Sequence, residues 1–234
     1  MTNQPNIECG ISATTKILIR GVDETADLEN PIYAINWFYC KRPWLYALYT
    51  KIAGKIARAN GAQAVFKGQL TATLPENGVN ERDTLLIVRY PSGHHFKNLV
   101  ENKVFQLSSL LRNKALQKFS FGFSKMHQLT EKPLDGKTNY LLQYFGSAPR
   151  SASFWESVTE LAASHSVELF YGGTIQANLV VQKEEEQKVP CVMDSLVVLS
   201  GNQEALKTLT QSEEYQVLLG NMEVLFTGFL NRQL

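Results

Sequence analysis

Four polar side chains lie within or beside apolar segments, where they could do chemistry. Asn36 interrupts an apolar stretch, Arg89 ends another, and His94 and His95 follow closely. A buried amide without a partner costs about 1–3 kcal/mol, so Asn36 either bonds within the core or meets a ligand. A histidine titrates near neutral pH, so His94 or His95 could move protons at a cavity rim, or could simply cap a helix at the surface. We predict catalytic roles for Asn36, His94 and His95.

Arg89 and a group of aromatic residues are the predicted substrate-binding residues. A guanidinium can bind a carboxylate or a phenolate, although Arg89 could instead reach solvent at the end of its strand. Most aromatic rings are expected in the core, and the remainder would line a flat apolar pocket if the fold leaves one. The aromatic residues assigned to substrate binding are Trp37, Phe38, Phe121 and Tyr144.

Motifs for metal ions and phosphate are missing from the sequence. Neither an HExxH motif nor paired Cys/His spacing is present, and Gly136-Lys137-Thr138 lacks the first glycine of a phosphate-binding loop. Cys9, Cys40 and Cys191 are widely spaced and odd in number, which favours free thiols in a reducing compartment. We therefore predict no metal site and no cofactor.

The elements that must position these residues occur twice. Tyr33-Ala-Ile-Asn-Trp-Phe38 is matched by Tyr140-Leu-Leu-Gln-Tyr-Phe145, and Phe119-Ser-Phe-Gly-Phe123 by Leu225-Phe-Thr-Gly-Phe229. An internal repeat of this kind predicts two similar structural units. The polar differences between the copies concentrate in the first, so we expect any small-molecule site to lie there.

Each half is predicted to run in the order β-α-β-β-α-β, the ferredoxin-like arrangement. The expected strands span 32–40, 64–74, 83–90, 118–126, 140–145, 167–181, 191–200 and 223–230. The expected helices span 44–59, 94–102 with a further helical stretch to about 117, 151–165 and 205–219. Both alternating faces of the first strand are apolar, so both must be buried, one by helices and one by another sheet. The predicted fold is α+β, with two tandem ferredoxin-like (βαββαβ) units packed sheet to sheet. The predicted boundaries are an N-terminal arm at 1–29, units at 30–128 and 139–234, and a linker at 129–138.

Two helix segments give this pattern a family resemblance. Val104-Phe-Gln106 and Glu213-Glu-Tyr-Gln216, with the segment 196–216 as the best match, resemble the dimeric α/β-barrel superfamily. Residues 31–127 and 139–232 are similar to short domains of unknown function related to antibiotic-biosynthesis monooxygenases. The resemblance implies an intramolecular dimeric α/β barrel with a cavity between sheet and helices.

The resemblance also implies a class of function. It indicates a small cofactor-independent enzyme of secondary metabolism, of the oxygenase, cyclase or isomerase type, acting on a small apolar or aromatic metabolite, with an anionic group on that metabolite left open. Two alternatives stay open: a non-catalytic small-molecule-binding or stress-related barrel protein, and a haem-binding barrel protein. Haem-binding relatives are expected to place a histidine about one turn past the aromatic residue of these helix segments. In this chain Ser108-Ser109 follow Phe105 and Leu218-Leu219 follow Tyr215.

Composition limits the partners. Among 234 residues, 23 Lys and Arg nearly balance 22 Asp and Glu, and the cations do not cluster, so nucleic-acid binding is not expected. No segment approaches the roughly 20 apolar residues of a membrane helix, and the polar N-terminus does not resemble a secretory signal. We predict a cytoplasmic protein whose partner is a small-molecule ligand, with the choice between monomer and homodimer left open.

Overall fold

The computed structural model describes residues 28–73, 82–130, 139–147, 149, 151, 153–180 and 194–233. In chain order the described elements are β1 (Ile32–Cys40), α2 (Pro43–Ala59), β2 (Gln63–Thr73), β3 (Thr84–Tyr90), α3 (Gly93–Glu101), α4 (Lys103–Ala115), β4 (Leu116–Leu129), β5 (Asn139–Phe145), α5 (Phe154–Ser164), β6 (Val167–Val180), β7 (Ser195–Gly201), α6 (Gln203–Gln211), α7 (Glu213–Leu219) and β8 (Val224–Arg232). Both halves therefore have the same order of elements.

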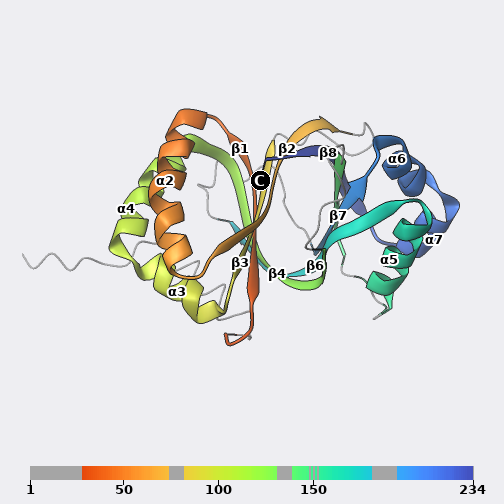
Figure 1. Cartoon of the computed structure of the whole chain (residues 1–234), viewed down its shortest axis with the longest axis horizontal. Helices are drawn as coiled ribbons and strands as arrows, with labels where there is room; N and C mark the ends of the chain where they lie inside the picture. Colours follow the sequence, from red (N-terminus) through yellow and green to blue (C-terminus); the bar gives the residue numbers. More distant parts are fainter. Residues whose placement is uncertain are drawn as a thin grey trace, which may run out of the picture.

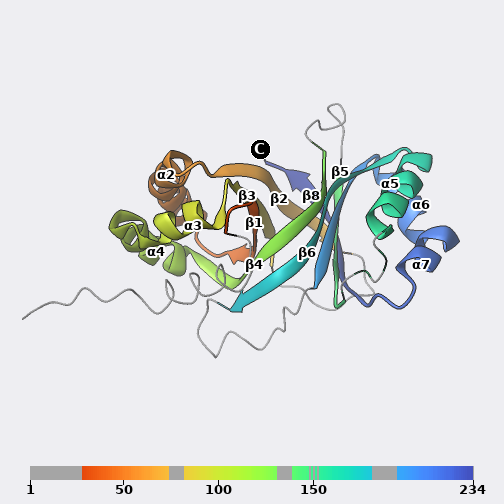
Figure 2. The ribbon, with the colours of Figure 1, turned by 90° about the horizontal axis from the view of Figure 1, so that it is seen from below.

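The strands form one closed barrel in the order β1-β3-β2-β8-β5-β7-β6-β4. Within each half the first strand pairs with the third and fourth, and the second strand pairs with the third. The two sheets join where β2 pairs with β8 and where β4 pairs with β6. Figures 1 and 2 show the strands in the middle of the molecule and a helix layer at each end. This arrangement confirms the predicted α+β fold with two units packed sheet to sheet.

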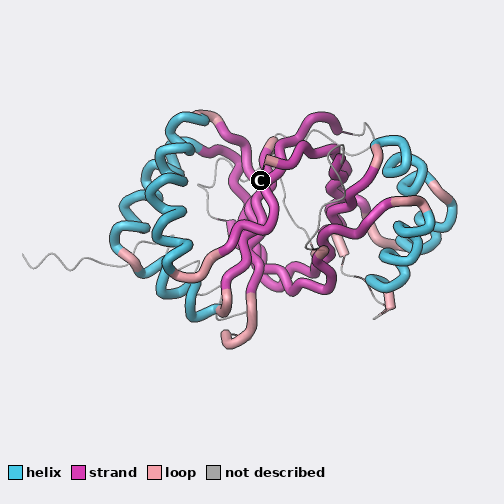
Figure 3. Tube along the Cα trace, in the orientation of Figure 1, coloured by secondary structure: helices cyan, strands magenta, loops and turns pink. Residues whose placement is uncertain are grey.

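Alternate residues of each strand supply two different cores. In β1, Tyr33, Ile35 and Trp37 face the barrel interior, whereas Ala34 and Phe38 pack beneath the helices. The interior is filled by aromatic rings that are at least 95% buried, namely Tyr33, Trp37, Phe66, Tyr140, Tyr144, Phe170, Tyr171 and Phe226. The strand ring drawn in Figure 3 thus encloses a packed core, and the space for a ligand must be sought between sheet and helices.

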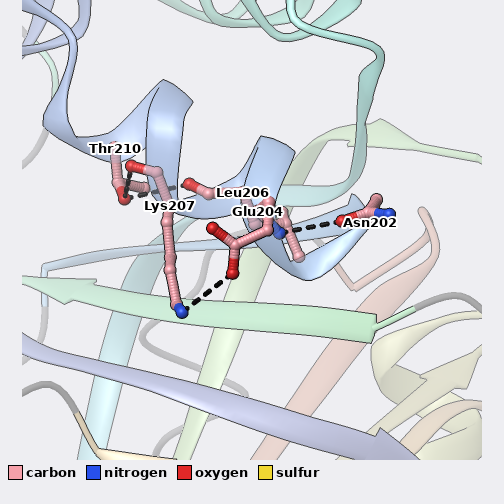
Figure 4. Close-up of polar contacts among 5 residues, drawn as sticks. All are labelled: Asn202, Glu204, Leu206, Lys207 and Thr210. Carbon is pink, nitrogen blue, oxygen red and sulfur yellow. Dashed lines mark hydrogen bonds and ion pairs between the residues drawn. The ribbon is translucent and has the colours of Figure 1, made fainter.

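The helix starts show where sequence patterns were too coarse. The segment 205–219, predicted as one helix, is two helices, because the Ser212 side chain accepts the Tyr215 N–H and starts α7 afresh. In the same way the Asn202 side chain accepts the Glu204 N–H at 2.8 Å and starts α6, where Lys207 pairs with Glu204 at 3.1 Å (Figure 4). In the described part of the chain, no helix combines the length and apolar character needed to cross a membrane.

Candidate functional site

A crevice of about 280 Å3 lies between the first half of α2, the end of β1, the middle of β2 and the start of β3. Most of its lining is polar: Cys40, Tyr46, Thr50, Lys67, Gln69, Asp83, Thr84 and Gln233. The crevice therefore combines an ammonium group, a carboxylate, a thiol, hydroxyls and amides in one small space. Such convergence of polar groups on a concave surface is typical of ligand sites.

Strand register places the polar residues of β2 on the side of the sheet that faces the helices. Lys67 pairs with Leu86, and Gln69 pairs with Thr84. Leu86 packs in the core beneath the helices, so Lys67 and Gln69 point to the same side. Because α2 packs chiefly against α4 rather than over β2, Lys67 stays half-buried and Gln69 is exposed.

In the second half the corresponding space is filled by a tryptophan. Trp155 of α5 lies against Gly172 of β6, so closely that a Cβ atom on Gly172 would come within 2.6 Å of the indole. The same indole stacks on the His127 ring at a centroid distance of 5.0 Å and an interplanar angle of 9°. His127 in turn bonds Thr174 at 3.0 Å. Aromatic packing therefore closes this side of β6.

Strand pairing shows that Lys67 and Gly172 occupy equivalent positions. Lys67 pairs with Leu86 just as Gly172 pairs with Val197. Leu86 pairs in turn with Asn36 in β1, and Val197 pairs with Gln143 in β5. Asn36 and Gln143 are the amide residues in the first strand of each half. The first half thus has a lysine where the second half has a glycine.

Thr50 and Trp155 are equivalent in the same sense. The ends of α2 and α5 are closed by matching backbone bonds, which are accepted by Ala57 and Ala162. Counting the same number of residues toward the N-terminus from Ala57 and from Ala162 leads to Thr50 in α2 and to Trp155 in α5. The threonine–lysine pair leaves the crevice open, and the tryptophan–glycine pair fills the same place in the other half.

Burial favours the protonated forms of two groups in the crevice, the Cys40 thiol and the Tyr46 hydroxyl. Burial and then the nearby Asp83 carboxylate raise the pKa of the Cys40 thiol, whereas Lys67 acts in the opposite direction. Burial strongly raises the pKa of the Tyr46 hydroxyl. Asp83 Oδ1 accepts the Cys40 N–H at 3.2 Å and the Thr84 hydroxyl at 2.8 Å. The described part of the crevice therefore combines several proton donors with the Asp83 side chain, which two hydrogen bonds hold in place.

This electrostatic arrangement predicts the reactivity of Cys40. Since the thiolate is the nucleophile, Cys40 should react with a maleimide more slowly at pH 8 than free cysteine does. Asp83→Asn should speed the reaction and Lys67→Met should slow it, because these changes remove opposite influences on the thiol pKa. The measurement is the pH dependence of the rate in a chain carrying Cys9→Ser and Cys191→Ser. Identical rates in all three proteins would contradict the assignment.

Three of the predicted site residues face the helices of the first half. Phe38 and Phe121 are buried there, and the Phe38 ring lies 5.2 Å from that of Tyr46, which lines the crevice. Asn36 is half-buried, and its Nδ2 donates to the carbonyls of Ala34 at 3.3 Å and Leu86 at 3.2 Å. Asn36 thus lies in the same cross-strand row as Lys67, with one strand between them.

Three other predicted residues lie on the barrel side of the sheet. The rings of Trp37 and Tyr144 meet inside the barrel at 5.8 Å, separated from the crevice by the sheet itself. The Trp37 Nε1–H has no hydrogen-bond partner among the described residues. Arg89 pairs with Tyr33, which faces the barrel, and it lies near the opposite end of β3 from Thr84.

The two predicted histidines lie at the start of α3, away from the crevice. Both are exposed. His94 Nε2 meets a Glu29 carboxylate oxygen at 3.0 Å, and His95 Nδ1 meets the Ser92 hydroxyl at 2.8 Å. The eight predicted residues therefore occupy three separate places and form no single constellation, whereas Cys40, Lys67 and Asp83 were not predicted.

Comparison with known proteins identifies the fold of this chain but does not identify an activity. No protein-family model matches the chain, and no curated protein matches it in sequence. A crystal structure described as a "putative monooxygenase" from Lactobacillus acidophilus NCFM is 14% identical, with 87% of this chain and 94% of that chain covered and a TM-score of 0.51. A second structure of that description, from Fusobacterium nucleatum, is 14% identical over 87% and 92% of the two chains, with a TM-score of 0.50.

A more distant match is a chlorite dismutase variant from Candidatus Nitrospira defluvii, which is 10% identical over 90% and 94% of the two chains, with a TM-score of 0.44. The fold of this chain is that of the dimeric α/β-barrel superfamily, as the resemblance in sequence implied.

Proposed function

We propose that this chain is a cofactor-independent enzyme that binds a small organic anion in the crevice beside Lys67 and forms an enolate from it. The observation that carries the proposal is the difference between the halves. The first half keeps an open polar crevice at the place where the second half is filled by Trp155. A volume of about 280 Å3 suits a metabolite smaller than most drug-sized ligands.

The charges of the crevice suggest how such a molecule would be bound and activated. The Lys67 ammonium would bind its carboxylate or carbonyl oxygen, where negative charge grows as the enolate forms. The protonated Tyr46 and Cys40 side chains would contribute further donors. Asp83 would accept the proton from the carbon next to the carbonyl, because its carboxylate is fixed by the Cys40 N–H and the Thr84 hydroxyl. Proton removal of this kind would be the common first step of isomerase, cyclase and oxygenase chemistry.

Haem fits the crevice poorly. Axial ligands of haem iron are histidine, thiolate, methionine or tyrosine. Among the described residues that line the crevice there is no histidine and no methionine. The two remaining possibilities, Cys40 and Tyr46, both have pKa values raised by burial, which disfavours the anionic forms that would bind iron.

Phenylpyruvate is a suitable test ligand, because it is a small aromatic carboxylate with exchangeable hydrogens next to its carbonyl. We expect saturable binding by NMR and faster deuterium exchange at its methylene group than in buffer alone. Lys67→Met should weaken binding by about 10- to 150-fold, the worth of a hydrogen bond to a charged group. Asp83→Asn should keep binding and lose the exchange.

The matched control is Lys55→Met, which removes an exposed cation of α2 outside the crevice lining. It should change neither binding nor exchange. Binding without accelerated exchange would favour the alternative of a non-catalytic binding protein. Binding that survives Lys67→Met unchanged would place the ligand elsewhere and contradict the proposal.

A further inference from the structure

The helix layers at the two ends of the molecule carry opposite charge. In α2 and α4 the charged residues are all cations, and the exposed ones are Lys51, Lys55, Arg58, Lys103 and Lys114. In α5 and α7 the charged residues are all acids, and all are exposed: Glu156, Glu160, Glu213 and Glu214. Figure 1 shows α2 and α4 at one end and α5 and α7 at the other. One end of the chain is thus a basic helix face and the other an acidic one.

Both faces also expose apolar side chains that the fold leaves uncovered. On the basic face, Trp44 and Leu107 are 69% and 66% exposed, with Val104 and Leu110 beside Leu107 on α4. On the acidic face, Val217 is 73% exposed. It lines an open groove of about 500 Å3 between α5 and α7, together with Leu161, Leu218, Glu213 and Glu214. Clustered exposed apolar residues of this kind mark interaction surfaces.

We propose that the basic α2–α4 face of one copy docks on the acidic α5–α7 face of a second copy. In this arrangement Leu107 and Leu110 would enter the groove, while Lys103 and Lys114 would meet Glu213 and Glu214. Complementary charge of this sort sets the partner and the orientation of an interface. Pairing two basic faces or two acidic faces would instead bring like charges together, so a symmetric two-fold contact through either layer is disfavoured.

The geometry of the two faces determines the kind of assembly. Each docked copy still presents one unused face, because the faces lie at opposite ends of the molecule (Figure 1). A head-to-tail contact of this type is heterologous and builds either a closed ring or an open chain of copies. The assembly should therefore grow with protein concentration and should weaken with salt, which screens exposed charges.

Sedimentation velocity of the full chain at low and high salt tests the proposal. The weight-average mass of the unmodified chain should rise with concentration in 20 mM NaCl and fall toward the monomer in 500 mM NaCl. The double variants Lys103→Glu/Lys114→Glu and Glu213→Lys/Glu214→Lys should each remain monomeric at low salt. An equimolar mixture of the two should associate again, because positions 103 and 114 of one variant are then acidic and positions 213 and 214 of the other are basic, so the contacting charges are again opposite.

Two controls keep the outcome decisive. Lys125→Glu reverses an exposed cation on β4, outside both faces, and should leave association unchanged. Circular dichroism should show that the double variants keep the fold, as expected for exposed positions. An unmodified chain that stays monomeric up to millimolar concentration at low salt would overturn the proposal, since the faces would then serve a different protein. A dimer that ignores both charge reversals would overturn it as well.

Discussion

Replacing Trp155 with threonine should lower the free energy of unfolding by about 3–5 kcal/mol, the usual cost of removing a large buried aromatic side chain. Only 8% of Trp155 is exposed. Its ring packs against Gly172 and His127, and it meets the Phe154 ring edge-on at 5.2 Å. Threonine is the residue at the equivalent place in the first half, so the change also reproduces the open form of this site. Urea denaturation, with a check that the slope stays constant, measures the effect.

Trp44→Thr is the matched control, because it makes the same chemical change at a position that is 69% exposed. In 500 mM NaCl it should change the free energy of unfolding by no more than about 0.5 kcal/mol. Equal effects of the two substitutions would mean that Trp155 does not fill a packed space. The interpretation of the second half as the closed copy would then be wrong.

Closing the crevice of the first half should abolish ligand binding. The double variant Thr50→Trp/Lys67→Gly copies the pair of residues that fills the second half. The indole should occupy the crevice as Trp155 occupies its own site, and the binding cation is lost. We expect phenylpyruvate binding to weaken by more than about 100-fold, since both volume and charge complementarity disappear. NMR titration measures the binding.

The single variants separate these two contributions. Lys67→Gly should weaken binding much as Lys67→Met does, and Thr50→Trp should weaken it by exclusion alone. The thermal midpoint of the double variant reports whether the indole packs, because the second half shows that this pair fits the fold. Full binding by a folded double variant would place the ligand outside the crevice.

Local sequence patterns were sufficient to predict most of the fold. The alternation of apolar residues, the helical spacing and the turn residues predicted the order of strands and helices correctly. The doubly apolar first strand correctly indicated a second sheet on its far side, because neither face could stay in water. The division of the segment 205–219 was missed because a serine inside a helical pattern can either continue the helix or cap a new one. The bond from the Tyr215 N–H to the Ser212 side chain and the extended backbone of Ser212 distinguish these outcomes.

The predicted site failed to come together for a simple geometric reason. Asn36 and Trp37 are neighbours in a strand, and consecutive side chains of a strand point to opposite faces. They could therefore never meet the same ligand in a sheet covered on both sides. Arg89 is separated from Asn36 in the same way, since its partner Tyr33 belongs to the barrel interior.

Lys67 left a signal in the sequence that an alignment of the two halves reveals. Phe66-Lys-Gly68 stands where the other half has Tyr171-Gly-Gly173. A lysine in one copy that aligns with a glycine in the other, within an otherwise apolar repeat, marks a position where the copies differ in function or packing. The packing of α2 chiefly against α4 could not be predicted in this way, because it depends on helix packing across the whole layer.

The position of β8 in the barrel has consequences for how the chain folds. This strand lies between β2 and β5, and it pairs residues as distant as Gly68 and Arg232. Contacts between such remote segments close late, since a long loop must first be ordered. Until β8 has paired with β2 and β6 has paired with β4, the first unit has two sheet edges with unpaired backbone groups. Such edges readily pair with other chains. Folding of this barrel should therefore be slow, and its half-formed state should be the one that a chaperone must protect.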